Sequence, residues 1–260
     1  MRRHPLVVAL LVFASTCSKS IDAYAARDVT LHYDVYYLAM PVVAVDVDAR
    51  RDAASYRTTV ALRSAGILHV FAPWESHVEA DGTIDGAIVR PVSYRADNAY
   101  RERRQRIDLA YERDGAVRGA VAGTLTDDAR DDVPMALREG TLDPVSASAA
   151  LAERLATTGS CAGTVAIYDG LRRYDLRYAD LGAATMEPSR RDPYRGEARL
   201  CRATVEPIAG FLPAGERATE ISAWLVLLAE GARPVAVRMD VSGPHGTLHV
   251  HLARVGIAPP

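Results

Sequence analysis

Apolar and polar residues alternate along much of this chain, and this alternation restricts the fold more than any other feature of the sequence. Residues 29–37 place an apolar or aromatic side chain at every second position, and residues 43–47 and 235–241 repeat the pattern. A period of two is typical of half-buried antiparallel strands. We therefore predict a mainly β domain, with turns at Arg51-Asp52, Asp81-Gly82, Asp85-Gly86 and Asp114-Gly115.

One helix is expected within this β pattern, beginning next to Asp143. Asp143 is a good N-cap residue, and Pro144 suits the first helical position. Residues 145–157 are rich in Ala and Leu and carry only two charged side chains, and Gly159 ends the segment. Such a helix should be largely buried. The predicted fold is a curved antiparallel sheet, or an open or half barrel, wrapped around this one helix.

The first 25 residues have the pattern of a secretory signal peptide. A positively charged start precedes a short apolar run at residues 6–14, and Ala23-Tyr24-Ala25 fits a small-x-small cleavage site. We predict cleavage after Ala25 and export to the periplasm. The mature chain, residues 26–260, shows no linker and is expected to form a single β-rich domain.

Three cysteines occur in the chain, and Cys17 would be discarded with the leader. The residues before Cys17 match a lipoprotein cleavage box poorly, so lipidation is the less favoured alternative. In an oxidising compartment, one disulfide between Cys161 and Cys201 is the simplest expectation, and two unpaired buried thiols are the alternative. Between these cysteines the sequence predicts a hairpin, comprising residues 165–167, the turn Asp169-Gly170 and residues 174–178.

The net charge argues against two classes of partner, and the hydropathy argues against a membrane-spanning helix. The formal net charge of -2 at pH 7 provides no bulk basic field that would draw the chain to nucleic acid or to anionic lipid. After the leader, no apolar run reaches the roughly 18 residues of a membrane-spanning helix. We therefore expect no transmembrane segment in the mature chain.

Residues 65–77 depart from the alternation and form an apolar stretch interrupted by a proline. This stretch contains Phe71 and Trp74, and the second tryptophan, Trp224, lies in a later strand signal. One interpretation is a lid on an apolar pocket, and the preferred one is core filling. We name Phe71, Trp74 and Trp224 as the candidate ligand-binding residues that would line such a pocket.

No sequence motif points to catalysis. The chain has no Gly-x-Ser-x-Gly elbow, phosphate loop, His-Glu-x-x-His or dinucleotide fingerprint. His249 and His251 would share one strand face, but a zinc site needs a third protein ligand and none is evident. Four arginines between positions 101 and 106 suggest either an anion or lipid-headgroup site or a solvated strand end. We expect no enzymatic activity, no metal and no cofactor.

A set of blocks spread over the mature chain matches a known pattern: residues 31–36, 90–94, 143–146, 168–175, 201–203, 223–225 and 233–237. Together these blocks resemble domain-of-unknown-function family 3108, a family of exported proteobacterial proteins. Val226-Leu227-Leu228 departs from the family pattern, which usually has an acid soon after the tryptophan. The resemblance implies a strand-rich sheet with an embedded helix, similar to the periplasmic lipoprotein carriers whose half-barrel shelters acyl chains.

The leading functional hypothesis is a non-enzymatic periplasmic protein that binds an apolar or lipid-like molecule inside its curved sheet. The alternative is a structural or protein-interaction factor of the envelope, which a filled core and a broad exposed apolar patch would favour. A hydrolase is the third hypothesis, and it requires converging polar groups in a cleft.

Overall fold

The computed structural model describes residues 28–126, 131–189, 191, 194–211, 219–229 and 232–258. The predicted leader, residues 1–25, lies outside the described residues. The first half of the chain forms a meander of seven strands, β1 to β7. These strands are β1 (Val29–Tyr37), β2 (Met40–Arg51), β3 (Ser55–Ser64), β4 (Trp74–Asp85), β5 (Ile88–Tyr100), β6 (Arg103–Tyr111) and β7 (Val117–Gly123).

A second meander of six strands follows, and it joins the first through pairing of β1 with β13. All neighbouring strands are antiparallel. Because each strand pairs with the next in an unbroken order, the described residues form one 13-stranded sheet with β7 and β8 at its edges. The prediction of a curved antiparallel sheet is confirmed. The strands are β8 (Gly163–Tyr168), β9 (Arg173–Met186), β10 (Gly196–Ala209), β11 (Glu220–Val226), β12 (Val235–Gly243) and β13 (Gly246–Ile257).

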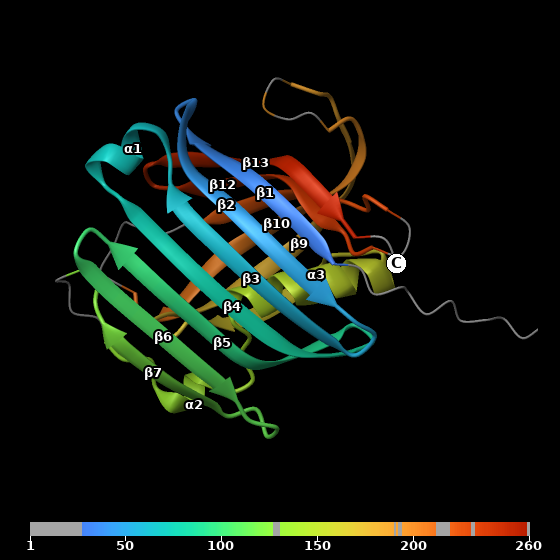
Figure 1. Cartoon of the computed structure of the whole chain (residues 1–260). Helices are drawn as coiled ribbons and strands as arrows, with labels where there is room; N and C mark the ends of the chain where they lie inside the picture. Colours follow the sequence, from blue (N-terminus) through green and yellow to red (C-terminus); the bar gives the residue numbers. More distant parts are fainter. Residues whose placement is uncertain are drawn as a thin grey trace, which may run out of the picture.

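Within the described ranges, three helices accompany the sheet: α1 (Gly66–Phe71), α2 (Met135–Arg138) and α3 (Pro144–Thr158). Figure 1 shows the sheet curling so that its two meanders face each other, with α3 between them. Asp143 caps α3, and Gly159 ends it in the left-handed conformation with φ of 70°. The helix therefore begins and ends where the sequence predicts.

Side chains of α3 pack against both meanders. Ala149 and Ala150 contact a cluster formed by the ends of β3, β4 and β5. On the other side, Ala147 packs among residues of β8, β9 and β10, and Leu151 and Leu155 pack beside the disulfide. The concave side of the sheet is thus occupied by the helix and the aliphatic side chains around it.

A buried carboxylate ties α3 to both meanders. Glu153 is only 2% exposed, and its two oxygens accept hydrogen bonds from Arg51 Nε at 2.6 Å and Arg233 Nε at 2.7 Å. Arg51 ends β2 in the first meander, and Arg233 precedes β12 in the second. One side chain of the helix is therefore paired with a cation from each half of the sheet.

The predicted disulfide is confirmed. Cys161, just after α3, is bonded to Cys201 of β10 with Cα atoms 6.2 Å apart, and both residues are buried. The predicted hairpin is also present, because β8 and β9 pair as antiparallel strands. Its turn is held by Asp169, whose carboxylate accepts hydrogen bonds from the amides of Leu171 and Arg172.

The turn predicted at Asp81-Gly82 is wrong, because both residues lie inside β4. The register of β4 against β5 shifts at this point, as at a β-bulge. A Cβ atom added to Gly82 would lie 2.3 Å from the Arg90 carbonyl oxygen and 2.7 Å from the Tyr56 ring. The glycine therefore serves close packing within a strand, whereas the turn predicted at Asp85-Gly86 does end β4.

Glu153→Gln should reduce the free energy of unfolding by about 3–5 kcal/mol, because it leaves two half-buried guanidinium groups without their buried counter-charge. The matched control is Glu206→Gln, which removes the partner of Arg177 on the exposed surface. That change should cost less than about 1 kcal/mol. Urea denaturation of both variants measures the difference, and equal losses would contradict the role assigned to Glu153.

Candidate functional site

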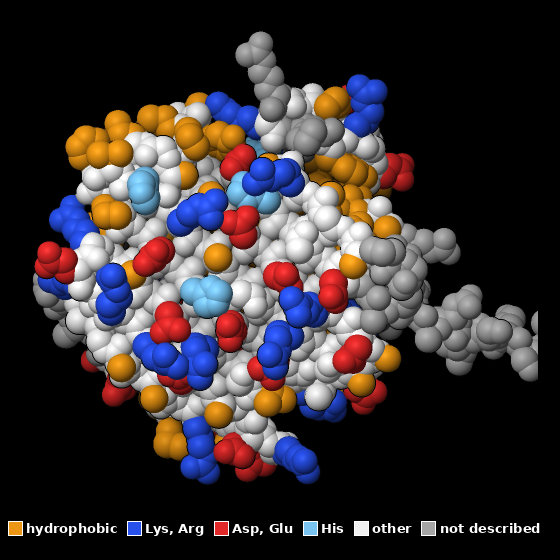
Figure 2. Space-filling view, in the orientation of Figure 1, with side chains coloured by type: hydrophobic (Ala, Val, Ile, Leu, Met, Phe, Trp, Pro, Cys, Tyr) orange, Lys and Arg blue, Asp and Glu red, His pale blue; other side chains and the backbone are white. Residues whose placement is uncertain are grey.

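One end of the barrel exposes a group of apolar side chains, which we call the apolar rim. Leu38 and Val70 are each 73% exposed, and Phe71 is 69% exposed. Figure 2 shows hydrophobic side chains gathered at the upper left, where Figure 1 places α1 and the β1–β2 turn. The apolar rim consists of Leu38, Met40, Ile67, Leu68, Val70 and Phe71.

The two segments of the apolar rim are packed together at the backbone. The amide of Ala65 donates a hydrogen bond to the carbonyl oxygen of Val42 at 2.8 Å. Gly66 has a φ of 56°, and a Cβ atom at this position would lie 2.6 Å from the Pro41 carbonyl oxygen. The close approach of α1 to the start of β2 therefore requires glycine, and it makes the rim one continuous surface.

The β1–β2 turn adopts a backbone conformation that does not suit its residues. Tyr37 pairs with Met40, which leaves a two-residue turn in which Leu38 and Ala39 have φ values of 46° and 67°. Hairpin turns with two positive φ values favour Asn-Gly, and a side chain with a Cβ costs roughly 1–2 kcal/mol in this region. Here the turn carries that cost and also exposes a leucine to water. Strain combined with apolar exposure is typical of a functional site rather than of a stabilising turn.

Helix α1 contributes nothing to the core. Its six residues are Gly-Ile-Leu-His-Val-Phe, none of them is buried, and its N-terminus has no side-chain cap. A helix this short is marginal in isolation. The apolar side chains of α1 are therefore available for contact with something outside the barrel.

Two arginines donate hydrogen bonds to backbone carbonyls of the rim segments. Arg101 Nη2 lies 3.1 Å from the carbonyl oxygen of Phe71, and Arg191 Nη2 lies 3.1 Å from that of Ala39. The guanidinium of Arg101 also lies over the ring of the adjacent Tyr100, at 5.4 Å from its centroid. These contacts hold two positive charges beside the apolar rim.

Aromatic residues lie directly next to the apolar rim and form what we call the aromatic belt. Trp74 begins β4 just after α1 and pairs with Tyr100 of β5. Tyr37 donates a hydrogen bond to the His245 carbonyl oxygen at 2.5 Å, and the Arg191 guanidinium lies 4.7 Å from the ring centroid of Tyr36. The aromatic belt, whose four members are half-buried, consists of Tyr36, Tyr37, Trp74 and Tyr100.

The three candidate ligand-binding residues do not converge on one described pocket. Phe71 belongs to the apolar rim and Trp74 to the aromatic belt, so core filling is the wrong interpretation for Phe71. Trp224 lies in β11 opposite Arg238, whose guanidinium carbon is 4.6 Å from its ring centroid. The assignment of these residues to a ligand pocket stays a prediction.

Sequence reasoning missed most of the apolar rim. Leu38 lies in a two-residue turn that contains no Gly, Asn, Asp or Pro, and Met40 follows it, so no turn signal marks these residues. Ile67 and Val70 fell inside the apolar stretch at residues 65–77, whose composition is equally typical of a core segment. The available signal is the apolar pair Leu38-Ala39, which lies between two segments in which apolar and polar residues alternate.

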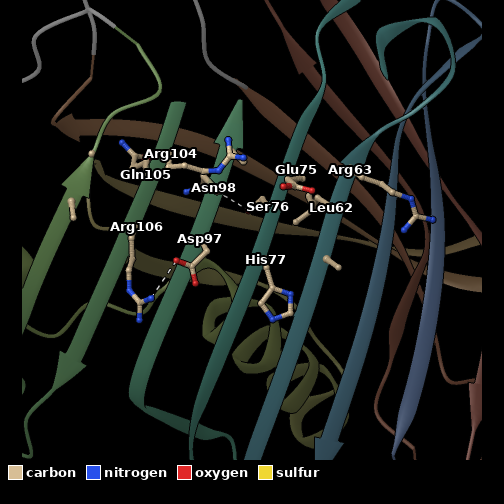
Figure 3. A pocket seen from close by; sticks show the side chains of 14 residues that line it. Leu62, Arg63, Glu75, Ser76, His77, Asp97, Asn98, Arg104, Gln105 and Arg106 are labelled. Carbon is tan, nitrogen blue, oxygen red and sulfur yellow. Dashed lines mark hydrogen bonds and ion pairs between the residues drawn. The ribbon is translucent and has the colours of Figure 1, made fainter. Parts of the chain in front are cut away.

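The outer face of the sheet carries two shallow depressions, and neither is lined by α3. The larger, of 680 Å³, crosses β3 to β7, where small residues such as Ala61 and Ala99 lower the surface between charged side chains. Figure 3 shows His77, Asp97 and Arg106 along it, with Arg106 paired to Asp97 at 3.6 Å. The second, of 540 Å³, adjoins the first at Ala61.

Charged groups in these depressions largely pair with one another. His32 Nδ1 lies 2.5 Å from Asp46, and Arg63 donates to the other oxygen of the same carboxylate at 2.9 Å. The hydrogen bond from His32 is the largest influence that lowers the pKa of Asp46. Among the described residues, no group of three His, Cys, Asp or Glu side chains is arranged to hold a metal ion. The His32, Asp46 and Arg63 side chains are therefore engaged with one another within the chain.

A buried chain of three polar side chains bears on the hydrolase hypothesis. The carboxylate of Asp143 accepts hydrogen bonds from the hydroxyl and amide of Ser146, and Ser146 Oγ lies 2.6 Å from the hydroxyl of Tyr56. None of the three lines either depression. The chain caps α3 and fastens it to β3, which is a structural role.

Burial raises the pKa of Asp143 to about 6, although hydrogen bonds from Ser146 and the helix amides oppose that rise. The folded chain then binds a proton between about pH 4 and pH 6 that the unfolded chain does not. Its free energy of unfolding should fall as pH rises through this window. Asp143→Asn keeps a capping side chain and should flatten that part of the stability–pH profile, measured by urea denaturation. An unchanged slope would contradict this assignment.

Leu38→Asn combined with Ala39→Gly should raise the free energy of unfolding by roughly 1–2 kcal/mol, because Asn-Gly suits the left-handed turn. Gly86→Ala is the converse control. Gly86 has a φ of 60° with no atom within 4 Å of an added Cβ, so its loss of stability reports backbone strain alone. Thermal unfolding measures both. A destabilised Asn-Gly variant would show that Leu38 and Ala39 are not strained.

Comparisons with known proteins identify a similar fold but indicate no activity. No family model matches the chain, and no curated protein matches it. Among solved structures, it is similar to the beta-barrel-like protein of domain of unknown function DUF1849 from Brucella abortus. That match has a TM-score of 0.50 at 11% identity and covers 91% of this chain and 99% of the other. The chain thus shares the fold of a β-barrel-like protein of unknown function, and family 3108 rests on the sequence blocks alone.

Proposed function

We propose that this chain is a non-enzymatic factor of the cell envelope that works by surface contact through its apolar rim. One observation carries the proposal: Leu38, Val70 and Phe71 are among the most exposed apolar residues described, and they lie together on one strained turn and one helix without core contacts. A folded domain seldom keeps such a surface in water unless something covers it.

The interior supports this choice over a ligand held within the sheet. Ala147, Leu151 and Leu155 of α3 pack against the strands of the second meander. The aliphatic residues that suggested a lipid pocket therefore have partners within the chain. A lipid-like ligand between α3 and the sheet stays a prediction. A packed core together with an exposed apolar patch favours the alternative of an interaction factor.

Export is part of the proposal. The Cys161–Cys201 disulfide supports an oxidising compartment, and no described helix is long and apolar enough to cross a membrane. We propose that residues 1–25 are removed after Ala25, that the mature chain resides in the periplasm, and that it belongs to family 3108.

The test is retention on washed envelopes of the cells that encode the chain. Purified residues 26–260 should sediment with these envelopes. Val70→Asp combined with Phe71→Asp should reduce retention at least about tenfold, because two large apolar contacts are lost. Neither side chain is buried, so the fold should persist.

The control for this test changes Ile88 and Leu181 to Asp. Both are exposed apolar residues outside the rim, so the control adds the same charge without touching the proposed surface. Its retention should match the unmodified chain. Equal loss in the rim and control variants, or full retention of the rim variant, would refute a role for the apolar rim.

A further inference from the structure

We propose that the apolar rim inserts into the interfacial region of a lipid bilayer that carries anionic headgroups. This inference rests on the proposed function, because it names what the rim contacts. Three features of the described structure carry it: the way the rim backbone is satisfied, the position of the aromatic belt, and the placement of the arginines.

Part of the rim backbone is hydrogen-bonded within the chain. The Phe71 carbonyl at the end of α1 accepts from Arg101, and the Ala39 carbonyl in the turn accepts from Arg191. The amide of Ala72 donates to the Leu68 carbonyl at 2.8 Å. Lipid chains offer no donors or acceptors, so a segment that enters them must satisfy its polar groups internally. A protein partner would not impose this requirement, since it brings hydrogen-bonding groups of its own.

The order of residues away from the tip matches the layers of a membrane interface. Aliphatic side chains and Phe71 lie outermost, and the aromatic belt follows on the adjoining strand ends. Tyrosine and tryptophan favour the headgroup level, where one part of the ring system is apolar and the other is wet. An interfacial segment of this kind reaches roughly 5–10 Å into the boundary between headgroups and chains.

The arginines beside the rim provide local charge complementarity to lipid phosphates, in a chain whose net charge of -2 gives no bulk attraction to anionic lipid. Arg101 and Arg191 are exposed on two separate segments that border the rim. The β5–β6 turn that holds Arg101 continues into β6 with Arg103 and Arg104, against one acid, Glu102. Guanidinium groups bind phosphate oxygens in bidentate geometry. This surface therefore fits anionic headgroups better than zwitterionic ones.

Protein-free vesicles test the proposal directly. The mature chain should sediment with vesicles that contain phosphatidylglycerol and more weakly with vesicles of phosphatidylcholine alone. Arg101→Gln combined with Arg191→Gln should reduce binding to the anionic vesicles by about fivefold per arginine and leave the weaker binding unchanged. The charge-matched control is Arg50→Gln combined with Arg90→Gln, both at exposed ion pairs outside the rim.

The Leu38→Asn, Ala39→Gly variant separates binding from folding. It is expected to be more stable than the unmodified chain, yet it removes a leucine from the rim and should weaken vesicle binding several-fold, by roughly the transfer contribution of one large side chain. A variant that folds better and binds less cannot be explained by misfolding. If it binds as well as the unmodified chain, the turn does not enter the bilayer.

The two tryptophans give a spectroscopic readout of depth. Trp224→Phe leaves Trp74 of the aromatic belt as the single tryptophan, and Trp74→Phe leaves Trp224, so selective excitation of tryptophan reports one position in each variant. Vesicles with brominated acyl chains should quench Trp74 strongly and Trp224 little, because Trp224 lies in β11 beside Arg238. Equal quenching of the two, or none of Trp74, would overturn insertion at the rim.

The outcomes distinguish this inference from the proposed function. Rim-dependent retention on envelopes with no binding to protein-free vesicles would mean that the rim contacts an envelope protein, which overturns the bilayer inference alone. Loss of rim dependence on envelopes would overturn the proposed function as well. Rim-dependent binding to anionic vesicles, with quenching confined to Trp74, would support both.

Discussion

The architecture depends on a carboxylate that is removed from water and shared between two cations. Glu153 lies on α3, and its guanidinium partners come from opposite halves of the sheet. Burying such a charge is unfavourable unless both its hydrogen bonds and its charge are matched. The helix therefore has one rotational setting and one depth at which the pair of arginines can reach it. This setting directs its alanines and leucines toward the two meanders and leaves the concave side filled.

Because side chains of α3 pack against the inner face of the sheet, we look for a binding site on the surface of the molecule. In a barrel with an open cavity, aliphatic residues on the inner faces would be the obvious ligand contacts. Here the same residues pack against α3, and several of the most exposed apolar side chains of the described residues gather in the apolar rim. Apolar side chains in the core are packed against one another, whereas those of the rim are exposed to water. The rim is therefore the surface that best indicates a function.

Local sequence signals predicted the parts of this fold that local physics determines. Asp143, Pro144 and Gly159 lie within or next to the helix they delimit, so their capping chemistry is readable without tertiary knowledge. The disulfide followed from the small number of cysteines. By contrast, Arg51 and Arg233 lie 102 and 80 residues from Glu153, and no local pattern relates them. Gly82 was misread because a glycine that permits close packing looks the same in sequence as one that makes a turn.

The candidate site was predicted only in part, for a related reason. Phe71 and Trp74 were selected as conspicuous aromatic residues, but the direction in which an apolar stretch faces is decided by the strands around it. The turn at Leu38 and Ala39 could not be predicted, because neither residue favours the left-handed conformation that it adopts there. A functional surface whose residues adopt a backbone conformation that they do not favour is the hardest kind to predict from residue propensities.

The pairing of β1 with β13 has a consequence for how the molecule is made. Val29 lies opposite Ile257, so the two meanders become one sheet only when the final strand is available. Until then β1 presents an unpaired edge of backbone groups, which is a template for association with other chains. A polypeptide with this topology leaves the ribosome with this edge of β1 open, and the edge closes only when β13 has followed.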